Sequence, residues 1–185
     1  VRQGEVRKPP VSRRVRREGE GMTAAQTFSV QALLPAVANE LRTRDDANRQ
    51  PELIVDRKGG SPLRCCLRRS RPGEAILLAS YAPLRRWAAE HNADPGAYDE
   101  LGPIFIHRDQ CDGPSGDGWP EEFRGSPRVL RAYDANGRLL GGQLLDPQND
   151  PDRALADLFA QPQVALVHAR VAVEGCFTFA VQPLR

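Results

Sequence analysis

Long apolar segments are missing from this sequence of 185 residues, although 40% of its residues are hydrophobic. No run approaches the roughly 20 consecutive apolar residues that a membrane-spanning helix needs. The first 21 residues also lack the apolar core, about 7 to 15 residues long, of a secretory signal. These absences predict a protein that does not enter a membrane and stays in the cytoplasm.

Cysteines at the spacing of a disulfide framework or of a C-x-x-C motif are missing as well. Of the four cysteines, Cys65 and Cys66 are neighbours, whereas Cys111 and Cys176 stand alone, and the sequence contains no C-x-x-C. This spacing disfavours a secreted disulfide framework, a thioredoxin-like reaction and a zinc ribbon. On this basis no metal is predicted.

The common catalytic signatures are also missing. The sequence has no glycine-rich phosphate loop, no G-x-S-x-G and no H-E-x-x-H. Activity, substrate and cofactor are therefore left open by the motifs.

Basic residues gather at the start of the chain. Residues 1–21 hold seven of the 26 Lys and Arg but three of the 24 Asp and Glu, which leaves 19 basic and 21 acidic residues beyond them. Few large apolar residues accompany these charges, so we predict a disordered basic leader at 1–21 and one domain at 22–185. Met22 is a candidate for the true start; the alternative is a basic arm for nucleic acid or anionic lipid. Binding of nucleic acid by the rest of the chain is not expected.

Hydrophobic periodicity predicts many short strands and few helices. Prolines at 35, 83 and 151 fit the first position of three short helices. Hairpin connections between the strands predict an α+β domain with a largely antiparallel sheet of about eight strands. The segment 108–127 has no period and is predicted to be a long loop. Strands are expected at 27–33, 52–56, 63–67, 75–81, 103–107, 128–134, 138–146, 163–171 and 176–181. An extended chain over 63–67 places Cys65 and Cys66 on opposite faces, which argues against one metal site holding both.

Four segments together resemble the domain of unknown function 1203 family, in the same order and at similar spacing. They read SPLRCCLRRSRPGEAILLASY, AYDELGPIFIH, PRVLRAYDANGRL and LFAQPQVALVHARVAVEGCFTFAV. The resemblance runs from about Phe28 to Val181. It implies a small, mostly bacterial, single-domain soluble protein without an assigned activity. Relatives commonly read P-C-R where this chain has Pro62, Leu63 and Arg64, so chemistry that depends on that cysteine is not expected here.

Polar residues that interrupt or end the apolar strands are the candidates for a site, because ligands usually bind where loops leave a rigid sheet. Arg64 either pairs with Glu74 or offers its guanidinium to a carboxylate or phosphate. The ligand-binding candidates are Arg64, Glu74, Tyr98, His107 and His168.

Two functions of different classes follow from these candidates. The first is binding of a small ligand or protein partner at a strand-end pocket. The alternative is an enzyme that uses His107 or His168 as a general base. A zinc set of His107, Cys111, His168 and Cys176 is chemically permissible, but its members come from distant segments and it is not adopted.

Overall fold

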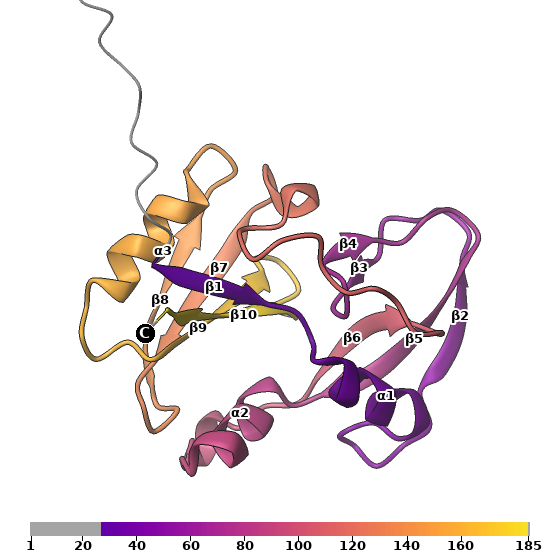
Figure 1. The fold of residues 1–185 in the computed structure, drawn as a ribbon, viewed down its shortest axis with the longest axis horizontal. Coiled ribbons are helices and arrows are strands. Elements are labelled where there is room, and N and C mark those ends of the chain that lie inside the picture. The colour runs from indigo at the N-terminus through magenta and orange to yellow at the C-terminus, as the bar shows by residue number, and fades with distance from the viewer. Residues whose placement is uncertain (1–26, 185) are drawn as a thin grey trace, which may run out of the picture.

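The computed structural model describes residues 27–184, which form one α+β domain with three α-helices and two sheets of five strands each (Figure 1). The α+β class and the single domain are therefore confirmed, but the strands divide between two sheets. The predictions for the leader and for a start at Met22 lie outside the described residues. Among residues 27–184, no helix combines the length and the apolar character that crossing a membrane requires.

The first sheet, here called the terminal sheet, contains both ends of the described chain. Its strands are antiparallel throughout. The β7–β8 hairpin turns at Asn136 and Gly137, as the sequence predicts, and Gly137 has a φ of 78°. In spatial order the strands are β1 (Phe28–Gln31), β10 (Phe177–Pro183), β9 (Leu166–Val171), β7 (Arg128–Tyr133) and β8 (Leu139–Leu145).

The second sheet, here called the middle sheet, is built from the segment between the first two helices and the residues that follow. Its β3 pairs with β6 in parallel through Leu63 and Phe105, and its other pairs are antiparallel. In spatial order the strands are β2 (Glu52–Asp56), β5 (Glu74–Tyr81), β6 (Gly102–His107), β3 (Pro62–Leu63) and β4 (Arg68–Arg69).

The three helices begin at the predicted prolines. They are α1 (Pro35–Thr43), α2 (Pro83–His91) and α3 (Pro151–Phe159). The Asp150 carboxylate accepts a hydrogen bond from Asp152 N at 3.0 Å and so caps α3. Two short 3-10 helices, Gly96–Tyr98 and Glu121–Phe123, lie in the connections.

Three groups of buried apolar side chains join these elements into one body. One lies between the terminal sheet, α3 and the aromatic residues of the 108–127 loop. A second lies between the middle sheet and α1. The third joins α2 to the terminal sheet through Trp87, Tyr133 and Leu166. The two sheets are thus held by α2 and by contacts across their junction.

The strand predicted over 63–67 is wrong, and this matters for the site. The strand ends at Leu63, and residues 64–67 form a turn in which Leu67 N donates to Leu63 O at 2.9 Å. Leu63 is buried in the core of the middle sheet, while Leu67 is buried in that of the terminal sheet. The chain must cross from one core to the other within these few residues, so it cannot stay extended. Leu67 adopts a φ of 56°, a left-handed conformation that is uncommon for leucine.

Candidate metal centre

The five predicted site residues do not form a single pocket. Among the described contacts, only Glu74 and His107 touch, with 3.1 Å between Glu74 Oε1 and His107 Nε2. Tyr98 is exposed in the first 3-10 helix. His168 is buried in the terminal sheet, where its ring packs against Tyr133 and Phe177.

Arg64 does not pair with Glu74. Its side chain is buried, and its Nε donates to Phe177 O at 2.8 Å while Nη1 donates to Pro62 O at 2.5 Å. Burial lowers the pKa of this guanidinium to about 10. Arg64 thus links the middle sheet to β10, and Glu74 is paired with Arg68 instead.

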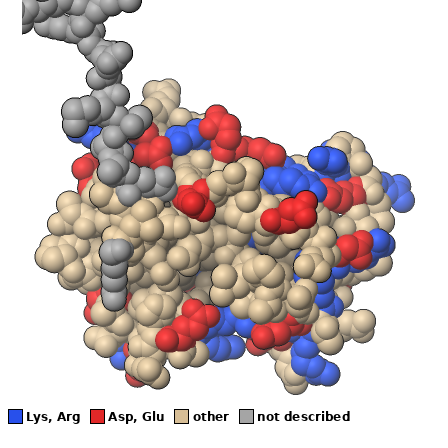
Figure 2. Space-filling view, in the orientation of Figure 1, with Lys and Arg blue, Asp and Glu red and all other residues tan. Residues whose placement is uncertain are grey.

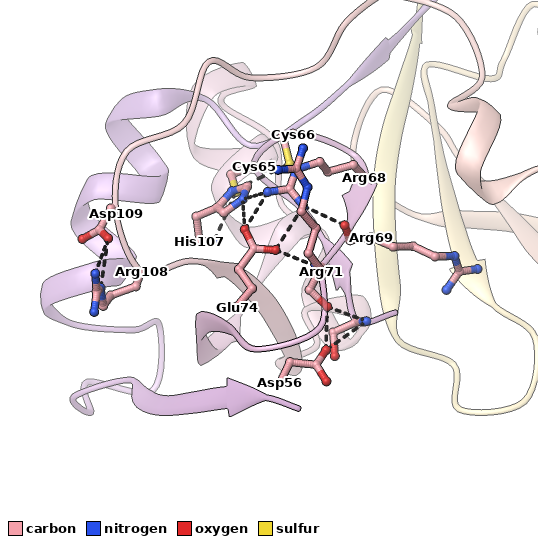
Figure 3. Close-up of polar contacts among 12 residues, drawn as sticks. Asp56, Cys65, Cys66, Arg68, Arg69, Arg71, Glu74, His107, Arg108 and Asp109 are labelled. Carbon is pink, nitrogen blue, oxygen red and sulfur yellow. Dashed lines mark hydrogen bonds and ion pairs between the residues drawn. The ribbon is translucent and has the colours of Figure 1, made fainter. Parts of the chain in front are cut away.

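Three thiols and one imidazole converge at the end of β6. The Sγ atoms of Cys65, Cys66 and Cys111 and a ring nitrogen of His107 all lie within 4.8 Å of one another. His107 Nδ1 is 3.2 Å from Cys65 Sγ and 3.8 Å from Cys66 Sγ. Figure 3 shows both cysteines beside the His107 ring, on the side away from Glu74. The turn at 64–67 brings the adjacent cysteines to the same place, which an extended strand would prevent.

The distances from His107 Nδ1 to two of the sulfurs are close to those in a tetrahedral metal site. With zinc bonds of about 2.3 Å to sulfur and 2.0 to 2.1 Å to nitrogen, a regular tetrahedron separates sulfur from nitrogen by about 3.6 Å. The two observed distances, 3.2 and 3.8 Å, lie on either side of that value. Cys65, Cys66 and His107 are buried and Cys111 is partly buried, so the four groups are largely removed from water.

Glu74 supports the outer side of the imidazole (Figure 3). Arg68 holds this carboxylate with two hydrogen bonds, of 2.6 and 3.1 Å, and Arg71 N donates to it at 2.7 Å. The pairing with Arg68 lowers the pKa of Glu74 to about 2, so the carboxylate is ionised. If His107 Nε2–H donates to Glu74, the Nδ1 lone pair faces the three sulfurs and is free to bind a metal.

A second tautomer suits the metal-free site. Arg68 Nη2 also lies 2.5 Å from His107 Nε2 and can donate to it when that nitrogen is unprotonated. His107 Nδ1 then carries the proton and donates to Cys65 Sγ. In both tautomers each ring nitrogen has a partner, so this arrangement leaves His107 no nitrogen for a substrate. The pKa of His107 is lowered by burial and by the charge of Arg68. This favours the neutral ring that metal binding requires.

The three thiols are not equivalent. The hydrogen bond from Cys65 lowers the pKa of Cys66, whereas the same contact and burial raise the pKa of Cys65. Burial also raises the pKa of Cys111. Cys66 is therefore the thiol of the three that ionises most readily, whereas burial opposes ionisation of the other two, and a metal ion that binds here displaces their protons.

The segment that carries His107 and Cys111 is fixed by α1. Arg42 donates from Nε to His107 O at 3.1 Å and from Nη2 to Asp109 O at 2.8 Å. Arg108 points away and pairs with Asp109 in Figure 3. The strand end and the start of the loop are thus held against the helix before any metal arrives.

Two cavities lead to the thiols. One of about 360 Å³ is lined by Cys66, Arg68 and residues of the loop between 114 and 122. Another of about 170 Å³ is lined by Cys65, Cys111 and residues of α1. Either cavity gives an ion a path to the site.

Of the four residues that the sequence suggested as a zinc set, two lie together in the structure. His107 and Cys111 are in the cluster, whereas Cys176 lies in the β9–β10 connection with its Sγ 3.8 Å from Glu174 O. Cys65 and Cys66 complete the group, and sequence reasoning rejected them because it treated 63–67 as extended. The signal that could have found them is the concentration of three of the four cysteines and one of the three histidines in two short segments.

Comparison with known proteins gives one match. The sequence model of the family described as "Protein of unknown function (DUF1203)" matches residues 60–183. This range contains all four members of the thiol and imidazole cluster. No match was found among the curated proteins or among the solved structures.

Proposed function

The chain belongs to the DUF1203 family, and we propose that it binds one zinc ion through Cys65, Cys66, His107 and Cys111. The observation that supports this is the convergence of three sulfurs and one imidazole nitrogen within 4.8 Å, from a turn and from a strand end more than 40 residues later. This proposal departs from the sequence analysis, which predicted no metal and a small ligand or protein partner instead.

The donor set favours zinc over the harder cations. Thiolate and imidazole are preferred by zinc and other soft or borderline metals, whereas magnesium and calcium prefer oxygen. A Cys₃His set is one of the usual combinations of structural zinc sites, in which all four positions are taken by protein atoms. The proposed centre accordingly has a structural role: it ties the 64–67 turn to the loop that begins at residue 108.

Positively charged side chains near the site offset the charge that such a centre would carry. Three thiolates and Zn²⁺ carry a net charge of −1 with a neutral histidine. Arg68 is close enough to Cys66 to interact electrostatically, and Arg42 is close enough to Cys111. These two guanidinium groups offset the excess negative charge, while Glu74 orients the imidazole from behind.

Native mass spectrometry with metal analysis tests the proposal. Purified protein supplied with zinc alone should gain the mass of one zinc ion less the protons that it displaces. Cys111→Ser should lower zinc affinity by at least about 100-fold, because one of four metal bonds is lost. Cys176→Ser is the matched control, since this cysteine lies outside the cluster; its affinity should be unchanged. Protein that binds no zinc, or an equal loss in both variants, contradicts the proposal.

A further inference from the structure

The last strand of the terminal sheet in spatial order, β8, is exposed along most of its length. Every residue from Leu139 to Leu144 is exposed, and only Leu145 is buried. The strand reads LLGGQLL and contains neither a charge nor a proline. Among the described residues it pairs with β7 alone, so the backbone N–H and C=O groups along its other side have no partner strand. β8 therefore presents backbone hydrogen-bonding groups together with exposed leucines.

The other three sheet edges in the described part of the chain are protected. The 108–127 loop covers the edge of β1, where Val30 N donates to Asp117 O at 2.9 Å. β4 contains two residues, and β2 has an acidic residue at each end. A covering loop, a short strand and charged residues are usual means by which proteins prevent another strand from pairing at an edge. β8 has none of these three.

Charges of opposite sign flank β8, which suits an identical strand as its partner. Arg138 precedes the strand, Asp146 follows it, and both are exposed. If two copies of β8 pair antiparallel about a two-fold axis at Gly142, Arg138 of each copy lies opposite Asp146 of the other. The same operation on β2 would place its two terminal acids opposite each other, where they repel. Charge complementarity therefore favours a second copy at β8.

Two adjacent glycines in β8 are not required by the packing of the chain itself. Neither Gly141 nor Gly142 has a positive φ. A Cβ atom at Gly141 would meet nothing within 4 Å, and one at Gly142 would meet its nearest neighbour at 3.7 Å, an ordinary contact. Glycine weakens a strand, and it often marks a place where another backbone approaches closely. The glycines lie at the centre of the strand, where the two copies would meet.

The pairing of β8 with β7 has one irregularity. The register shifts at Leu140, and the residues from Gly141 to Leu145 continue in regular pairing. Arg138 is also held only loosely, because its ion pair with Asp94 is 3.6 Å long and both side chains are exposed. The regular part of the strand and the flanking charges thus remain available to a partner.

We propose that two copies of this chain associate through β8, which pairs antiparallel with β8 of the other copy and joins the two terminal sheets into one continuous sheet. The exposed leucines of both strands are then partly removed from water. Because the interface is one strand wide, the dimer should be weak, with a dissociation constant of about 1 to 100 μM. The zinc centre lies in the other sheet and takes no part in this association.

Sedimentation velocity of the full chain tests this proposal, with a reductant present because the chain has four cysteines. The unmodified protein should change from monomer to dimer between about 1 and 500 μM. Leu144→Lys should weaken association at least about ten-fold, because it places like charges in the interface. Leu53→Lys is the matched control, since the two leucines are 56% and 58% exposed and both lie in edge strands. It should leave the dissociation constant unchanged.

Exchange of the flanking charges tests the pairing itself. Arg138→Asp and Asp146→Arg should each weaken self-association at least about ten-fold, because each variant places like charges opposite each other. An equimolar mixture of the two variants should form a heterodimer, in which each opposed pair again has opposite charges. Its dissociation constant should lie within about three-fold of that of the unmodified protein.

Three results would overturn the proposal. The unmodified protein stays monomeric over the whole concentration range, Leu53→Lys weakens the dimer as much as Leu144→Lys, or the mixture of charge variants stays monomeric. All four substituted positions are exposed, so the variants should fold as the unmodified protein does. The measurement on the unmodified protein decides the matter even if one variant does not fold.

Discussion

At the candidate metal centre, the orientation of a ligand depends on a neighbouring residue that does not bind the metal itself. Glu74 is not a ligand in the proposed site, yet it contacts the ring nitrogen of His107 opposite the sulfurs. Its own position is fixed by Arg68 and by Arg71 N. A carboxylate in this position selects the tautomer of the histidine and makes the imidazole a better metal ligand.

Removal of the Glu74 charge should therefore weaken zinc binding without abolishing it. We expect Glu74→Gln to lower zinc affinity by about 10 to 100-fold, as outer carboxylates of histidine ligands do in other metal sites. Competition with a chelator of known affinity measures this. Glu122→Gln is the control, because Glu122 accepts a hydrogen bond from Arg69 N at 2.5 Å but does not contact His107. Equal affinities for Glu74→Gln and the unmodified protein would show that Glu74 does not support the ligand.

Among the structural elements, the turn at 64–67 is the one on which the site depends. It bends because Leu63 and Leu67 belong to different cores. The left-handed conformation of Leu67 is tolerated because its side chain, 4% exposed, is buried in the core of the terminal sheet, which also contains Trp119 and Phe123. Packing of an apolar side chain therefore determines where the two adjacent thiols lie.

Truncation of this side chain should affect both stability and metal binding. Leu67→Ala is expected to lower the free energy of unfolding by about 2 to 4 kcal/mol, since it removes a buried leucine from a packed core. It should also weaken zinc binding, because the turn loses its anchor. Leu53→Ala, at a position on β2 that is 58% exposed, should change the free energy of unfolding by less than about 0.5 kcal/mol. Denaturant titrations with and without zinc compare the two, and similar losses in both variants would contradict this account of the turn.

On the scale of the whole molecule, the described residues carry charges of both signs on the surface. Figure 2 shows acidic and basic side chains interspersed over the face in view. One buried titratable side chain, His168, lies in β9 on the face of the terminal sheet that packs against α2. There His168 is fully enclosed beside Arg131 and Arg170, and both burial and these two charges lower its pKa well below 6.5.

This burial makes the stability of the protein depend on pH. Because the pKa of His168 is lower in the folded state than its usual value of 6.5, the unfolded chain binds the proton more tightly. The stability that comes from keeping His168 neutral is fully present above pH 6.5. It is lost as the pH falls toward the pKa that His168 has in the folded state. The loss amounts to at most about 1.4 kcal/mol per pH unit for one proton.

Variants at two histidines isolate this effect. His168→Leu should reduce the dependence of the unfolding free energy on pH below 6.5 by about one proton. His91→Gln is the control, since His91 lies exposed at the end of α2. Urea titrations between pH 5 and 7 of metal-free protein measure the slopes. The assignment fails if His168→Leu leaves the slope as steep as that of the unmodified protein.

Elements with a clear local signal were predicted well from the sequence. The apolar run of β5, the Asn136–Gly137 hairpin and the prolines at the starts of the helices give correct elements within one to three residues. The prediction fails at 63–67, where alternation of side chains looks like a strand. Local periodicity records which residues are apolar, but it does not record that Leu63 and Leu67 are buried in different cores.

The same distinction applies to the sites. Composition and motif spacing by themselves determined an α+β domain with short antiparallel strands, and His107 at the end of a buried strand, because these depend on neighbours in the chain. The convergence of Cys65, Cys66 and Cys111 on His107, and the enclosure of His168 with Trp87, were decided only by the tertiary structure. Both depend on contacts between segments that are distant in sequence, which form when two sheets pack and each apolar side chain is assigned to one core.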